Sequence, residues 1–214
     1  MPKLSVNDLD RIHDIPLTIE LVREHYSRPM TDDEAQDRLD TVQHECAHLV
    51  AAIACKGAYI GSIQIYAPHV PRRKPAGRVE SCGDLLQHEA FMSFAGHAWE
   101  SKLHNGDARR AANDLNEGIQ YARELGVPHQ LIYDAAAHFV NMSAAQTIRD
   151  AAVGVVCLMP QHGMLCKGKL AHLVKWLRPQ ILVSDVLTSP KAISYRQKAP
   201  AIWKSFGGAE KIGN

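Results

Sequence analysis

The sequence lacks any apolar run long enough to cross a membrane, and it lacks an excess of charge of either sign. The longest apolar stretches, such as 48–55 and 151–159, fall well below the ~20 residues that a membrane-spanning helix requires. Lysine and arginine together number 24, against 23 aspartates and glutamates, so no global field attracts the chain to nucleic acid or anionic lipid. We therefore expect a soluble protein that binds neither nucleic acid nor membranes.

The cysteines lack the spacing of a disulfide framework or of a thiolate metal site. There are five, an odd number, and no two of them form a CxxC pair. The opening residues MPKLSVNDLDRIHD also lack the apolar core of a secretory signal. Both observations favour a reducing, cytoplasmic environment.

Most of the chain has the periodicity of amphipathic helices. Residues 31–34, TDDE, form a capping-box signature, and the helix that follows carries apolar residues at spacings of three and four until about Lys56. Alternation of apolar and polar residues predicts two short strands, 60–66 and 77–81. Further helices are predicted at about 86–103, 108–125, 129–142, 143–159 and 165–177.

These elements predict a mainly α fold of the α+β class with a small sheet. We expect an N-terminal arm over 1–30, one α-rich domain over 31–178, and an irregular tail with several prolines over 179–214. The oligomeric state has no signature in the sequence.

The five residues HECAH, 44–48, carry the clearest chemical signal. Residues four apart on a helix lie on one face, so His44 and His48 can present ring nitrogens to one cation. Glu45 is placed to act as general base on a zinc-activated water. With 12 histidines in the chain, roughly 0.03 such matches are expected by chance. The motif therefore predicts a zinc site within the helix.

A catalytic zinc needs a third protein ligand and an open position for water. The extended motif HExxHxxGxxH is not present, because Ala51 and Cys55 occupy its glycine and third-histidine positions. The spacing of residues alone does not identify which later side chain is the third zinc ligand. These candidates are Glu80, His88, His97, Glu100, His104, Asp107 and Asp114.

Several segments, taken in order, resemble the peptidase domain of FtsH-type membrane AAA zinc metalloproteases. HECAHLVAA is similar to that family's HEAGHALVA, and GSIQIYAPH followed by PAGRVES is similar to its strand, loop and glycine-led second strand. FAGHAWESKLHNG resembles LGGRAAEELVFG, and ARRAANDLNEGIQYARELG resembles GASNDLERATELARRMV. The resemblance covers about residues 40–127. It implies a helical, zincin-like metallopeptidase domain with a small β-hairpin beside the HExxH helix.

The resemblance also implies a complete ligand set. In that family the aspartate of the NDL segment completes the zinc site, which makes Asp114 the third ligand beside His44 and His48. Glu100 matches the family's AE pair, where a carboxylate can accept an N–H from a ligand histidine and fix the orientation of its ring. A thermolysin-like alternative, with Glu100 itself as third ligand, stays open.

The chain departs from the family in lacking the ATPase module, with its GxxxxGK[ST] loop, and the membrane segments before it. It is therefore not expected to unfold substrates by itself, and a separate unfoldase or regulator could act with it. Cys46 replaces a small family residue and is expected to pack in the core. We expect a peptide to pair with the strand 60–66, and the basic residues 72–74 to lie in a solvated loop.

Together these features predict a zinc-dependent metallopeptidase, independent of ATP by itself, that cleaves peptides or unfolded protein segments. An alternative from another class is a catalytically inactive metal-binding regulatory or scaffold protein of the same fold. The intact Glu45 argues against that alternative, because an inactive protein does not need the base. A third hypothesis is a histidine-rich helical protein that binds no metal.

Overall fold

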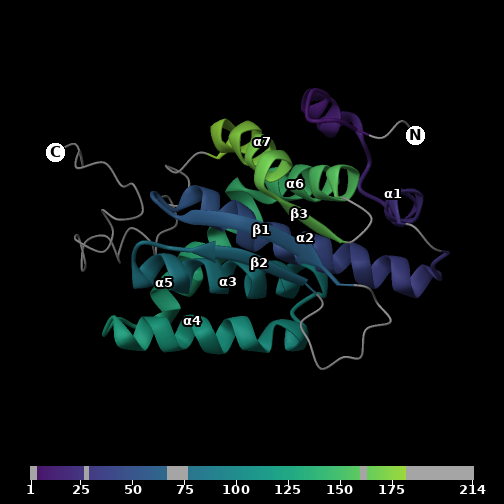
Figure 1. Ribbon diagram of the computed structural model, residues 1–214. Helices are drawn as coiled ribbons and strands as arrows, with labels where there is room; N and C mark the ends of the chain where they lie inside the picture. Colours follow the sequence, from purple (N-terminus) through teal and green to yellow (C-terminus); the bar gives the residue numbers. More distant parts are fainter. Residues whose placement is uncertain (1–3, 27–28, 67–76, 160–162, 182–214) are drawn as a thin grey trace.

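The computed structural model describes residues 4–26, 29–66, 77–159 and 163–181, and it is mainly helical with one small sheet (Figure 1). This confirms the α+β class that the sequence predicts. In chain order the elements are η1 (Leu9–Asp14), α1 (Ile19–His25), α2 (Asp32–Ala54), β1 (Tyr59–Ile65), β2 (Gly77–Cys82), α3 (Leu86–Leu103), η2 (Arg109–Ala111), α4 (Ala112–Glu124), α5 (His129–His138), the π-helical turn η3 (Phe139–Ser143), α6 (Ala145–Leu158), β3 (Met164–Cys166), α7 (Lys167–Leu177) and η4 (Arg178–Gln180).

The long helix α2 is the central element, and it contacts α1, α3, α6, β1 and β2. It begins with the predicted capping box: the Thr31 hydroxyl accepts from the Glu34 N–H at 3.2 Å, and the Glu34 carboxylate accepts from the Thr31 N–H at 3.1 Å. From residue 38 to residue 54 every side chain is buried except those of His44 and His48. The two histidines therefore mark the place where this buried helix reaches solvent.

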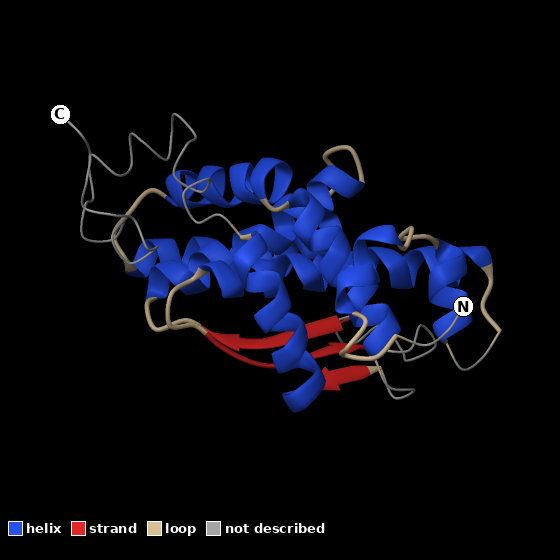
Figure 2. Cartoon of the chain, turned by 90° about the horizontal axis from the view of Figure 1, so that it is seen from above, coloured by secondary structure: helices blue, strands red, loops and turns tan. Residues whose placement is uncertain are grey.

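The sheet is antiparallel with strand order β2-β1-β3, and Figure 2 shows it along one side of the molecule with most of the helices on the other. The predicted hairpin forms, with Ile63 opposite Val79. On its other edge, β1 pairs with β3, where Ile63 lies opposite Leu165. The helix predicted from 165 begins instead at Lys167, because the three residues before it complete this sheet.

The position of β1 corrects one expectation. The sequence predicts that a peptide pairs with the strand 60–66, but both edges of β1 already carry a partner strand. The outer edge of β2 is not paired by any strand of the described residues. A peptide that extends the sheet on the hairpin side therefore has to pair with β2.

Helices α3 and α4 form an antiparallel pair behind and below the sheet in Figure 1. α3 ends close to its predicted limit, and the chain turns through Asn105 and Gly106, both with positive φ. α4 begins at Ala112, later than predicted, because Arg109–Ala111 forms the 3₁₀ turn η2. Farther on, η3 separates α5 from α6 at the predicted junction of two helices.

The N-terminal segment shares its core with the rest of the fold, since Leu9, Ile12 and Leu21 belong to the same hydrophobic cluster as α2. Cys46 is fully buried in that cluster, as expected. No helix of the described residues is long and apolar enough to cross a membrane. The loop residues 72–74 and the predicted tail beyond residue 181 lie outside the described residues.

Candidate metal centre

Two histidines of α2 face each other across one turn of the helix. The Nε2 atoms of His44 and His48 lie 3.2 Å apart, and the two rings meet edge to face. This is the geometry that the i, i+4 spacing predicts. Two ring nitrogens at this distance can share a proton or bind one cation.

Asp114, in the first turn of α4, brings a carboxylate to the same point. Its Oδ2 lies 3.1 Å from Nε2 of His44 and 3.5 Å from Nε2 of His48. Of the His, Cys, Asp and Glu side chains in the described part of the chain, this is the one group of three placed to hold a metal ion. The side chains of His44 and Asp114 are 15% and 21% exposed, so solvent reaches the cluster.

Close packing of α4 against α3 places Asp114 over the histidines. Gly118, one turn beyond Asp114, lies against the ring of Phe94, where a Cβ would come within 2.4 Å of Cε1. Any larger residue would push the two helices apart. The position of Asp114 therefore depends on a glycine that has no functional side chain.

The other ring nitrogen of each histidine faces an acceptor. Nδ1 of His48 lies 2.8 Å from the carbonyl oxygen of Met92, and Nδ1 of His44 lies 3.5 Å from Oε2 of Glu100. Such contacts leave Nε2 free as the ligand atom and fix the plane of the ring. Glu100 thus contacts Nδ1 of His44, whereas Asp114 contacts Nε2 of the same ring. Glu100 therefore lies on the far side of His44 from Asp114 and is not part of the three-residue group.

Gly96 of α3 makes room for the ring of His48. A Cβ at this position would lie 2.2 Å from Nε2 of His48, closer than any real contact. Sequence patterns alone do not indicate this role for Gly96. The one sequence feature that could have indicated it is that Gly96 lies in FAGHAWES, the segment that resembles the family's LGGRAAEE.

Glu45 lies buried between the histidine cluster and β2. The backbone N–H of Val79 donates a hydrogen bond to its carboxylate, and a Cβ on Gly77 would lie 2.6 Å from its Cγ. Burial raises the pKa of the Glu45 carboxyl, while His44 and His48 act in the opposite direction. The carboxylate is therefore held between the cluster and β2, where burial favours its protonated form.

The charges of the cluster reinforce one another. Burial alone would lower the pKa of His44, but hydrogen bonding to Asp114 and Glu100 outweighs it and raises the pKa to about 10. Burial likewise works to raise the pKa of Asp114, but the charge of His48 and hydrogen bonds from both histidines hold it well below its usual range. At neutral pH the cluster therefore combines an ionised Asp114 carboxylate with a protonated His44, and a cation that binds there takes the place of the proton.

The remaining candidates for third ligand have no ligand atom in this group. Glu80 is exposed on β2, His97 lies 3.2 Å from the Tyr133 hydroxyl, and Asp107 pairs with Arg109 at the surface. The candidates outside the group are Glu80, His88, His97, Glu100, His104 and Asp107.

Comparison with models of known protein families, with curated proteins and with solved structures finds no significant match to this chain. The relation to FtsH-type peptidases stays a prediction from the segments quoted above. The structure shows that ligand atoms of His44, His48 and Asp114 lie within 4.8 Å of one another, close enough to hold one metal ion.

Proposed function

We propose that this protein is a zinc metallopeptidase with His44, His48 and Asp114 as ligands. The observation that carries the proposal is the set of distances between ligand atoms, 3.1, 3.2 and 3.5 Å. Tetrahedral zinc with bonds of ~2.0–2.1 Å separates neighbouring ligand atoms by about 3.3–3.4 Å. A set of two imidazoles and one carboxylate also leaves the fourth position open, as catalytic zinc sites do.

Glu45 supplies the acid–base chemistry in this proposal. When bound, a zinc ion would polarise a peptide carbonyl and lower the pKa of a water molecule. The Glu45 carboxylate takes a proton from the attacking water and later delivers one to the amine that leaves. Its hydrogen bond from Val79 holds the carboxylate on the side of the cluster that faces β2.

The substrate in this proposal is a peptide or an already unfolded segment. An extended chain pairs by main-chain hydrogen bonds with the outer edge of β2, the strand that packs against Glu45. The resemblance to FtsH-type peptidase domains supports the same reaction and a zincin-like fold.

The test is a comparison of the wild-type protein with Glu45→Gln. Each is loaded with zinc and incubated with a varied peptide library, and new peptide termini are identified by mass spectrometry. We expect cleavage by the wild type and a loss of at least about 10²-fold in Glu45→Gln, the usual contribution of a general base. Elemental analysis should give about one zinc per chain for both proteins.

Two outcomes contradict the proposal. Full activity of Glu45→Gln would reject the mechanism. Stoichiometric zinc with no cleavage by the wild type would favour the metal-binding regulatory or scaffold protein, and less than about 0.1 equivalent of zinc would remove the metal site altogether.

A further inference from the structure

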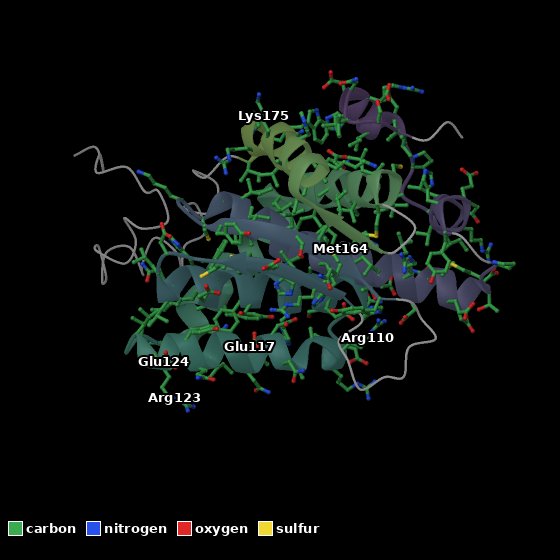
Figure 3. The ribbon with its side chains drawn as sticks, viewed as in Figure 1. Arg110, Glu117, Arg123, Glu124, Met164 and Lys175 are labelled. Atoms are coloured by element: carbon green, nitrogen blue, oxygen red, sulfur yellow. The ribbon has the colours of Figure 1, made fainter. Side chains whose placement is uncertain are left out.

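Arg110 connects three elements beside the metal centre. It lies in η2, just before the helix that carries Asp114, and Figure 3 shows it next to the start of α4. Its Nη2 lies 2.8 Å from Oδ1 of Asp37 on α2, and its Nε lies 3.6 Å from Oε1 of Glu100 on α3. The guanidinium therefore spans the two helices that hold His44 and Glu100.

The two oxygens of Glu100 face in different directions. Oε2 lies 3.5 Å from Nδ1 of His44, whereas Oε1 lies 3.4 Å from Nε2 of His104 and 3.6 Å from Nε of Arg110. The residue is only 2% exposed, so water does little to hold its carboxylate in place. A buried carboxylate of this kind takes its orientation from the cations around it.

We propose that Arg110 is a positioning residue for the metal centre, acting through Glu100 on the ring of His44. The planar guanidinium contacts the Asp37 carboxylate with one nitrogen and the Glu100 carboxylate with another, which fixes the direction of Glu100. Glu100 in turn fixes the ring that presents Nε2 to the metal. This inference rests on the metal-binding part of the proposed function and is independent of peptide cleavage.

Arg109, the neighbouring residue, provides a matched control. It also lies in η2 and also pairs with a carboxylate, at 2.6 Å from Oδ2 of Asp107. Its side chain is 91% exposed, and among the described residues its guanidinium pairs with Asp107. Arg109→Ala removes the same charge from the same turn without touching Glu100.

The experiment measures zinc affinity by competition with a chromogenic chelator, for the full-length wild type, Arg110→Ala and Arg109→Ala. We expect Arg110→Ala to bind zinc about tenfold more weakly, the lower end of the effect of removing groups that support metal ligands. Arg109→Ala should match the wild type. The visible absorption bands of bound Co²⁺ should change in Arg110→Ala alone, since they report ligand geometry and not overall stability.

A second pair of variants tests the route through Glu100. Arg110→Ala should weaken zinc binding in the wild-type background and have little further effect in a Glu100→Gln background. Equal losses in both backgrounds, or equal affinities for Arg110→Ala and Arg109→Ala, would overturn the proposal. Failure of the wild type itself to bind zinc would instead reject the proposed metal site, and zinc binding without peptide cleavage would leave the role of Arg110 intact.

Discussion

Gly77 and Gly96 contribute space to the site and no functional group. Gly96 lies where a Cβ would overlap the ring of His48, and Gly77 lies where a Cβ would overlap the Glu45 side chain. Each glycine therefore supports a different part of the proposed chemistry. Gly96 affects the proposed metal ligand His48, and Gly77 affects the proposed general base Glu45.

This difference gives a prediction for two alanine variants. Gly96→Ala should displace the His48 ring and weaken zinc binding by about tenfold or more. Gly77→Ala should leave zinc affinity within about twofold and lower kcat by about 10²-fold, because it shifts the acid–base group alone. Chelator competition and the peptide-cleavage assay measure the two effects separately.

Gly168→Ala is the control for these variants, since a Cβ at that position meets no heavy atom within 4 Å. It should keep both zinc affinity and activity. If Gly77→Ala and Gly96→Ala lost zinc binding equally, the assignment of the two glycines to separate functions would be wrong.

Residue-level chemistry is the part that the sequence predicts best. The two histidines and Glu45 follow from one helical turn, because i, i+4 geometry needs no other part of the chain. Gly77 and Gly96 can be read in the sequence, but the side chain that each glycine accommodates is known only from the packing around it. That approach is decided by contacts between elements.

At the scale of single elements, α2 shows how local interactions define a helix. Its capping box satisfies two amide donors at the start, and the histidines lie more than three turns farther along. A change at the cap should therefore affect stability without altering the metal site.

Replacing Thr31 by alanine should lower the free energy of unfolding by about 1 kcal/mol, the usual cost of losing an N-cap side chain. Urea denaturation measures the change, and zinc affinity should remain that of the wild type. Thr31→Ser keeps a hydroxyl at the cap and should recover most of the loss. An equal loss in Thr31→Ser would assign the effect to packing of the Thr31 methyl group instead.

The strand β3 shows the limit of element-level prediction. Three residues are too few for alternation to be recognised, and the strand exists because Ser62–Gln64 of β1 offers it backbone partners. The same pairing makes β1 the central strand and leaves β2 at the edge beside Glu45. Met164 of β3 is one of the exposed large apolar residues and is labelled in Figure 3.

At the scale of the whole molecule, the metal site joins α2 to α4, which are separated along the chain by the hairpin and α3. An ion bound by both helices stabilises the folded state by mass action, by about 2.7 kcal/mol at a free concentration of 100 Kd. We therefore expect zinc to raise the melting temperature and EDTA to reverse the increase.

The zinc-dependent increase should be larger at pH 8 than at pH 6. The folded-state pKa of His44 is raised to about 10, so the metal-free protein holds a proton there that zinc has to displace. Protonation of His44 stabilises the metal-free fold fully below its unfolded pKa of ~6.5, and this contribution is lost as the pH rises through about 10. Zinc therefore displaces this proton more readily as the pH rises, and the zinc-dependent increase grows.

Calorimetry of the wild type and Asp114→Asn, with and without zinc, checks this prediction. Asp114→Asn should lose most of the zinc-dependent increase at both pH values, because the third ligand is weakened. An increase that is the same in the two proteins would place the bound zinc elsewhere.

The sequence by itself determined the central helix, its cap and the pair of histidines with Glu45 between them, because these depend on neighbours within a few residues of each other. The resemblance predicted that Asp114 and Glu100 lie near the histidines, but only the tertiary structure shows Asp114 beside Nε2 of both rings and Glu100 beside Nδ1 of His44. It also decided that β2 is the edge strand. Those relations join residues far apart in the chain, and packing between helices and pairing between strands bring them together.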